Sequence, residues 1–167
     1  KTIGGQKFVF VPWITPENEE NILKILKNVS NQDTICVGHF ELDGFQMFQG
    51  IRNEGGMSRD VLKGFKMVWS GHFHTRSTEG NVYYLGSPYE FVWSDCDDPR
   101  GFHIYDTETG DLEFLENPKK MFHKIYYDDR QPLPQVERYA GTCVKIIVAH
   151  KEDYAKFEQY IDALYAQ

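Results

Sequence analysis

The sequence predicts an α/β fold in residues 1–117, followed by a small α+β unit in residues 118–167. In the first region, strand-like apolar runs alternate with helical segments, and two of those runs end in Gly-His. A hairpin pattern closes that region, and a new strand pattern begins after the Asn-Pro break at residues 117–118. We therefore place a domain boundary near Pro118 and expect the second unit to be incomplete.

Composition sets the first limits on function. The chain has 167 residues, of which 41% are hydrophobic and 26% charged, enough to bury a core. Its formal charge of −7 argues against broad electrostatic wrapping of nucleic acid, although metal ions could still meet a phosphate. The longest apolar run, at residues 8–14, is too short to cross a bilayer, so we expect a soluble cytoplasmic protein without a membrane partner. Three widely spaced cysteines indicate neither a disulfide framework nor a thiolate zinc site.

The first region contains the elements of a parallel crossover. Residues 7–14 read as a strand, Thr15 as a cap with Pro16 at the first helical position, and the stretch that follows as an amphipathic helix. Apolar strands are predicted at residues 34–42 and 65–70, with a short helix after Ser58 between them. Two strands joined through a helix favour parallel pairing.

Antiparallel structure is predicted farther along. Residues 81–91 read as a strand with a Gly-Ser-Pro turn at residues 86–88, and residues 101–116 as a hairpin whose turn is Thr109-Gly110-Asp111. The last region has strands at residues 121–127 and 143–148 and a helix that begins at Asp153.

The segment VWSGHFHT carries the first chemical signal. His72 and His74 are two residues apart, so they share a face only if the chain is extended there. His39 also follows an apolar strand and a glycine, and carboxyl ends of strands are where sheet-based enzymes place ligands. Three converging imidazoles would suit a borderline divalent metal.

The other histidines are expected to be ordinary polar or exposed residues, namely His103, His123 and His150. Two chemistries remain open for the predicted site. Three histidines with an open position could form a mononuclear zinc hydrolase or lyase, whereas an added bridging carboxylate could hold two metals across a phosphoester.

The motifs GHFELDG, SGHFHT and YYLGSPYEF occur in this order, and together they resemble the second half of a calcineurin-like metallophosphoesterase. The nearest likeness is to DNA-repair nucleases of the SbcD type, in particular the recombination endonuclease subunits of T-even-like bacteriophages. The resemblance covers most of residues 1–117. It implies the second half of a four-layer metallophosphoesterase sandwich, followed by a capping domain.

The resemblance also implies roles for residues. His39 and His72 would bind one metal ion and His74 the other, with Mn²⁺ as the usual ion and Mg²⁺ as an alternative. The implied substrate is DNA, the implied partner is a coiled-coil ATPase of the SbcC type, and the intact enzyme is expected to be a homodimer in the cytoplasm, that of the bacterial host if a phage encodes it.

The family's earlier motifs, Asp-x-His, Gly-Asp and Gly-Asn-His, have no counterpart in this sequence. Those motifs supply the bridging carboxylate and the catalytic histidine, so we expect this fragment to be inactive alone. Arg76 could hold the DNA backbone or be a solvated surface residue. The alternating aromatics Tyr89, Phe91 and Trp93 are predicted to pack on one face, although such residues can also stack on bases.

Two alternatives to a DNA nuclease remain. The same metals could serve a phosphatase or phosphodiesterase that acts on a small substrate, because the surrounding loops decide the substrate. The chain could also be a noncatalytic module that docks DNA or a partner, in which case removing metal should leave binding unchanged.

Overall fold

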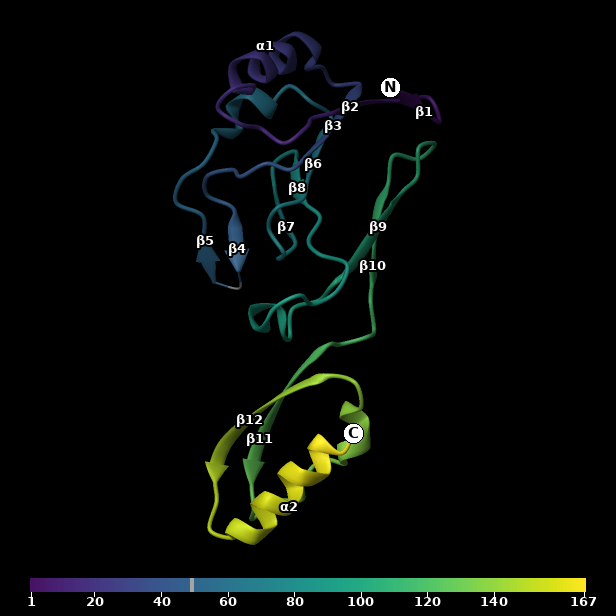
Figure 1. Cartoon of the computed structure of the whole chain (residues 1–167). Helices are drawn as coiled ribbons and strands as arrows, with labels where there is room; N and C mark the ends of the chain where they lie inside the picture. The colour runs from purple at the N-terminus through teal and green to yellow at the C-terminus, as the bar shows by residue number, and fades with distance from the viewer. Residues whose placement is uncertain (49) are drawn as a thin grey trace. The chain divides into compact units, whose positions relative to one another are not determined.

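The computed structural model describes residues 1–48 and 50–167, which divide into two compact units (Figure 1). The first unit comprises residues 1–88 and 98–117, and the second comprises residues 89–97 and 118–167. Residues 89–97, which the sequence had suggested belong to the first region, cluster with the second unit. No helix in the described ranges is long and apolar enough to cross a membrane.

A mixed sheet forms the centre of the first unit. Its strands, in spatial order, are β1 (Thr2–Ile3), β2 (Gln6–Phe10), β3 (Thr34–Gly38), β6 (Met67–Ser70), β8 (Val82–Tyr84) and β7 (Ser77–Glu79). The four strands from β2 to β8 are parallel, and β1 and β7 pair antiparallel at the edges. The predicted parallel crossover between β3 and β6 is confirmed, with Gly38 opposite Ser70. Parallel strands end at a common edge, so residues that follow them meet there.

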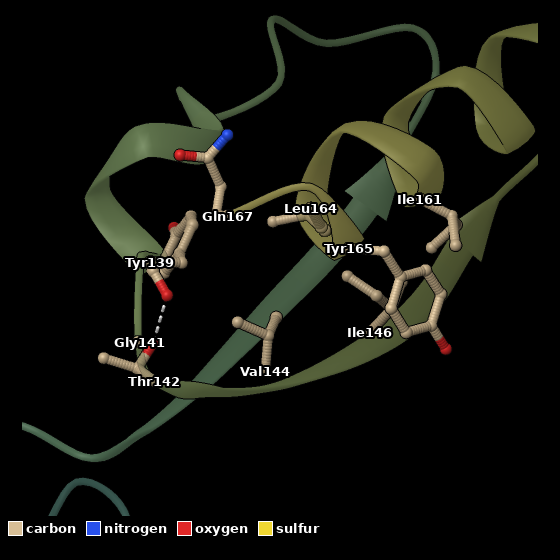
Figure 2. Close-up of a pocket in the computed structure, with 9 residues that line it drawn as sticks. All are labelled: Tyr139, Gly141, Thr142, Val144, Ile146, Ile161, Leu164, Tyr165 and Gln167. Carbon is tan, nitrogen blue, oxygen red and sulfur yellow. Dashed lines mark hydrogen bonds between the residues drawn. The ribbon is translucent and has the colours of Figure 1, made fainter.

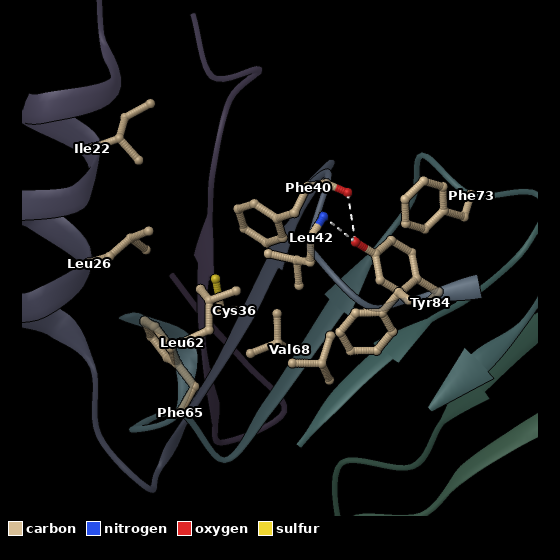
Figure 3. Close-up of a cluster of buried hydrophobic side chains, with 12 residues drawn as sticks. Ile22, Leu26, Cys36, Phe40, Leu42, Leu62, Phe65, Val68, Phe73 and Tyr84 are labelled. Carbon is tan, nitrogen blue, oxygen red and sulfur yellow. Dashed lines mark hydrogen bonds between the residues drawn. The ribbon is translucent and has the colours of Figure 1, made fainter. Parts of the chain in front are cut away.

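One helix and one short 3₁₀ helix accompany this sheet. Helix α1 (Glu19–Val29) buries Ile22 and Leu26, which are one helical turn apart (Figure 3). The expected cap at Thr15 is wrong: Asn18 is the cap, because its side chain accepts a hydrogen bond from Thr15 N and closes a turn before the helix. The 3₁₀ helix η1 (Arg59–Leu62) begins at Ser58, as predicted, where the Ser58 hydroxyl accepts from Asp60 N.

The core of the first unit lies between α1 and the sheet and extends under the loop that follows β3 (Figure 3). Its buried members are Ile22, Leu26, Cys36, Phe40, Leu42, Phe45, Leu62, Phe65, Val68, Phe73, Val82 and Tyr84. Burial raises the pKa of the Cys36 thiol to about 12, so this cysteine is an apolar packing residue.

Two hairpins complete the first unit. The predicted hairpin is confirmed as β9 (Gly101–Tyr105) paired antiparallel with β10 (Leu112–Glu116), and Gly110 in its turn has a left-handed φ of +82°. The second is β4 (Gln46–Phe48) with β5 (Ile51–Arg52).

The second unit is a small parallel pair with a helix. Strands β11 (Phe122–Asp128) and β12 (Cys143–His150) are joined through the 3₁₀ helix η3 (Val136–Tyr139), and α2 (Tyr154–Tyr165) follows. The helix start at Asp153 is confirmed, since its carboxylate accepts from Lys156 N. The buried core residues are Ile125, Tyr127 and Tyr160.

The segment 89–97 joins the second unit through a buried carboxylate. Glu90 Oε2 accepts hydrogen bonds from the backbone N–H groups of Met121 at 2.7 Å and Phe122 at 2.8 Å. Of the segment predicted as a strand with a Gly-Ser-Pro turn, residues 82–84 form strand β8, which ends before that turn, and the 3₁₀ helix η2 (Trp93–Asp95) follows.

Candidate metal centre

His39 and His72 lie beside each other at the carboxyl edge of the sheet. His39 follows β3 and His72 follows β6, and the last residues of these neighbouring strands, Gly38 and Ser70, are paired in register. The two imidazole rings are 5.3 Å apart between centroids and nearly perpendicular, at 87°. We call them the histidine pair.

The glycine before His72 makes this approach sterically possible. A Cβ atom on Gly71 would lie 2.7 Å from Nδ1 of His39, closer than real Cβ contacts allow. This explains why a glycine precedes His72 after β6: without a side chain, Gly71 leaves the space that the imidazole of His39 occupies.

His72 has an unusual backbone. Its φ is +84°, in the left-handed region that disfavours residues with a Cβ atom. Such strain persists only where the surroundings enforce it, and it is concentrated at functional sites. The strain at His72 is therefore an independent indication of function at this edge.

Buried polar contacts fix the loop that carries His39. Ser70 Oγ accepts from Phe40 N at 2.9 Å. Tyr84 is fully buried, and its hydroxyl donates to Phe40 O at 2.9 Å and accepts from Leu42 N at 3.0 Å (Figure 3). Burial raises the pKa of Tyr84 to about 12, so the phenol keeps the proton that it donates. Neighbouring strands thus hold the loop before any ligand binds.

The surroundings of His39 favour the neutral form of its imidazole. Desolvation lowers the pKa of His39, and the nearby His72 lowers it further. Neutral imidazole is the form that binds metals. Glu41 Oε2 lies 3.7 Å from His72 Nε2 and adds a carboxylate beside the rings. Two imidazoles and a carboxylate are donor types that suit a divalent ion such as Mn²⁺, but in the described ranges these three side chains do not place their ligand atoms all within 4.8 Å of one another.

The chain around His74 is not extended. His72 and His74 both lie in bends, and the left-handed backbone at His72 removes the alternation that would place their side chains on one face. In the described ranges, the three predicted ligands do not form a group whose ligand atoms all lie within 4.8 Å of one another. His74 is anchored through its carbonyl, which accepts from Ser87 N at 3.1 Å and from the Arg100 guanidinium.

Arg76 stacks on an aromatic ring of its own unit. Its guanidinium carbon lies 3.8 Å from the centroid of Phe114, and the side chain is on the exposed surface. This contact orients the arginine without using up its hydrogen-bond donors.

Sequence reasoning missed Trp13. Its ring centroid is 5.1 Å from that of His39 and 6.1 Å from that of His72. It also lines a pocket of about 300 Å³ next to the histidine pair, together with Ile14, Glu19, His39, Phe40, Glu41, Gly56 and Met57. Its position just after β2 was a usable signal, because β2 is the next parallel strand at the same sheet edge.

A second group of potential ligands lies in the second unit. Among residues 1–48 and 50–167, the one group of three or more such side chains within 4.8 Å is Asp128, Asp129 and His150, which we call the acidic cluster. Asp129 accepts from His150 Nδ1 and from the backbone N–H groups of Glu152 and Asp153, all at 2.6–2.8 Å.

The acidic cluster is better explained as a structural feature. Asp128 receives a two-pronged contact from Arg130, at 2.9 and 2.8 Å, which lowers the pKa of Asp128 to about 2. The contacts from His150 and from Asp153 N hold the pKa of Asp129 well below its usual range. These carboxylates are already occupied by donors, so a metal ion would have to displace them.

The second unit also has a pocket of about 360 Å³ between η3, β12 and α2 (Figure 2). Its lining is Tyr139, Gly141, Thr142, Val144, Ile146, Ile161, Leu164, Tyr165 and Gln167. None of these side chains is acidic, basic or a histidine, and Thr142 Oγ1 donates to Tyr139 O at 2.7 Å. The lining therefore has no evident catalytic group.

Comparison with known proteins supports the resemblance seen in the motifs. No family model matches the chain. The chain is 37% identical over 153 residues to Exonuclease subunit 1 of Enterobacteria phage T4. The aligned residues make up 91% of this chain and 44% of that relative. The predicted likeness to a phage recombination nuclease subunit is confirmed. The chain spans less than half the length of this relative.

Proposed function

We propose that this chain contributes part of the active site of a metal-dependent nuclease that hydrolyses phosphodiester bonds in DNA during recombination and repair. The observation that carries the proposal is the histidine pair, held at the ends of neighbouring parallel strands with a strained backbone at His72. The likeness to a phage exonuclease subunit supports DNA as the substrate.

In this proposal the first unit is the second half of a metallophosphoesterase sandwich, and the second unit is a small capping domain. His39 and His72 hold one divalent ion, Mn²⁺ by preference, and His74 contributes to a second. An ion bound there supplies positive charge against the substrate phosphate. The chain's own part is to present His39 from a loop that Ser70 and Tyr84 fix in place, and His72 from the end of the neighbouring strand.

The proposed partner is a coiled-coil ATPase of the SbcC type. The relative is itself named a subunit, which supports assembly with another chain. DNA and this ATPase would therefore be the two macromolecules to test for binding.

A metal titration tests whether the histidine pair binds a divalent ion. We expect weak Mn²⁺ binding by the chain, and His72→Ala should weaken it by about tenfold or more, because removal even of groups that merely orient ligands costs about 10–100-fold. His150→Ala is the matched control, since it removes an imidazole from the acidic cluster and should leave Mn²⁺ affinity unchanged. Equal losses in both variants, measured by calorimetry, would refute the assignment.

A digestion assay tests the activity. The chain alone should not cleave DNA, because its histidines lack the bridging carboxylate that places two ions about 3.5–4 Å apart. A fusion that adds the segments of the phage T4 relative with no counterpart in this chain should cleave in the presence of Mn²⁺. The His74→Ala fusion should fold normally and lose cleavage. Robust cleavage by the chain alone, or by that variant, would show that the site is misassigned.

The same fusion separates the alternatives. Faster hydrolysis of mononucleotides or of bis(p-nitrophenyl) phosphate than of duplex ends would favour a small-molecule phosphodiesterase. Binding of DNA that does not change when metal is removed, with no hydrolysis, would favour a docking module.

A further inference from the structure

Trp13 is a large, exposed aromatic side chain beside the histidine pair. Its exposed fraction is 58%, although tryptophan side chains are on average highly buried. It belongs to the rim of the pocket that also contains His39 and Glu41. Packing of the first unit therefore does not account for the outward part of this indole.

The sheet places the indole where a substrate of the histidine pair would lie. Strands β2, β3 and β6 are neighbours and parallel, and each is followed at its carboxyl end by one of Trp13, His39 and His72. The indole contacts both imidazoles, at 5.1 and 6.1 Å between centroids. A phosphate held at the histidines would thus have a flat apolar surface beside it.

The charges around the pocket indicate which part of a substrate each group would contact. The charged side chains in the lining are Glu19 and Glu41, and the lining contains no lysine or arginine. A phosphate can be held there only if a bound cation offsets the two carboxylates. Trp13 offers dispersion and stacking, which suit a nucleobase rather than a phosphate.

We infer that Trp13 is a substrate-contacting residue that stacks on a nucleobase of single-stranded DNA whose neighbouring phosphate lies at the histidine pair. This inference rests on the proposed function, because it assumes a divalent ion at His39 and His72. It adds the recognition of an unpaired base, which those histidines cannot provide. Stacking on one aromatic side chain changes affinity by roughly 5- to 150-fold per base.

Tryptophan fluorescence tests the inference with the chain as it exists. The three tryptophans are residues 13, 69 and 93, so the difference between the wild-type protein and Trp13→Leu reports on Trp13. The titrants are Mn²⁺ alone, then a short oligothymidylate with Mn²⁺, then an abasic oligomer of the same length with Mn²⁺. The abasic oligomer keeps the phosphates and lacks the bases.

We expect Mn²⁺ alone to quench Trp13, and His72→Ala to reduce that quenching. With Mn²⁺ present, oligothymidylate should quench Trp13 further and bind about tenfold more tightly than the abasic oligomer. Trp13→Leu should remove that preference, and Trp13→Phe should keep part of it. The comparison of two oligomers on the wild-type protein does not depend on the folding of a variant.

The outcomes separate the two proposals. Equal affinity for both oligomers, with normal Mn²⁺ quenching, would overturn the role of Trp13 and leave the metal site standing. Absence of Mn²⁺ quenching and of any effect of His72→Ala would overturn the metal site itself. Concentration-dependent self-association that Trp13→Leu abolishes would assign the indole to a contact between two copies, and would also overturn the inference.

Discussion

The histidine pair in the first unit and the acidic cluster in the second contain the same kinds of ligand, but their surroundings differ. His39 and His72 face each other and Trp13, and in the described ranges no side-chain hydrogen bond engages the His39 ring. In the acidic cluster, Asp129 accepts from His150 and from two backbone N–H groups at the start of the segment that leads into α2.

This difference teaches that proximity of ligand atoms is a poor guide to a metal site unless their existing partners are considered. The acidic cluster has the shorter distances, but Asp128 and Asp129 each already accept three hydrogen bonds. The histidine pair has the wider spacing, but desolvation lowers the pKa of His39 and the backbone of His72 is held in the left-handed region. The following predictions test this contrast, starting with the largest expected effect.

Tyr84→Phe should destabilise the first unit and loosen the histidine pair. The substitution removes the hydroxyl that bonds Phe40 O and Leu42 N, leaving both buried groups without that partner. We expect the free energy of unfolding to fall by about 1–3 kcal/mol, and Mn²⁺ affinity to fall with it. Tyr83→Phe, on the same strand, is the matched control. Urea denaturation and calorimetry measure both quantities, and an unchanged stability of Tyr84→Phe would contradict the role of the hydroxyl.

Replacing His72 with glycine should separate stability from binding. Glycine adopts a φ of +84° without the penalty that a Cβ atom brings, so His72→Gly should be about 1 kcal/mol more stable than His72→Ala. Both variants should bind Mn²⁺ equally poorly. Urea denaturation of the two proteins side by side checks the strain, and equal stabilities would mean that the backbone at His72 is unstrained.

The sequence anticipated those parts of the fold that local patterns determine. The parallel β3–β6 crossover, the β9–β10 hairpin and the Asp153 helix start follow from periodicity, turn residues and capping, and all are confirmed. The predicted cap at Thr15 is wrong: Asn18 is the cap, and its side chain accepts a hydrogen bond from Thr15 N. Both residue types are good caps, and their spacing in the sequence does not decide between them.

The missed features depend on contacts between distant segments. The grouping of residues 89–97 with the second unit depends on Glu90 reaching Met121 and Phe122, about 30 residues away in the chain. The left-handed backbone at His72 is equally invisible in the sequence, because histidine has only a weak preference for that region. For the candidate site, sequence patterns predicted the three histidines, and the structure shows that two of them are neighbours. They did not predict Trp13, whose signal lay in the strand order.

The smallest effect at neutral pH is expected from the acidic cluster, because its contribution to stability changes only in acid. Its carboxyl pKa values are lowered in the folded state, that of Asp128 from an ordinary value of 3.8 to about 2. Groups with lowered pKa values stabilise the fold fully above the unfolded-state pKa, and this contribution is lost as the pH falls through the folded-state pKa. The second unit should therefore lose stability between about pH 4 and pH 2.

The backbone amides of Glu152 and Asp153 provide the readout, because both donate to Asp129. Their ¹⁵N–¹H shifts should titrate with midpoints well below pH 3.8, and Asp129→Asn should abolish that titration. Asp111→Asn, in the β9–β10 turn, is the control and should leave these two amides unchanged. Midpoints near pH 4 would mean that the carboxylates hold their donors weakly, and the acidic cluster would then be as open to a metal ion as the histidine pair.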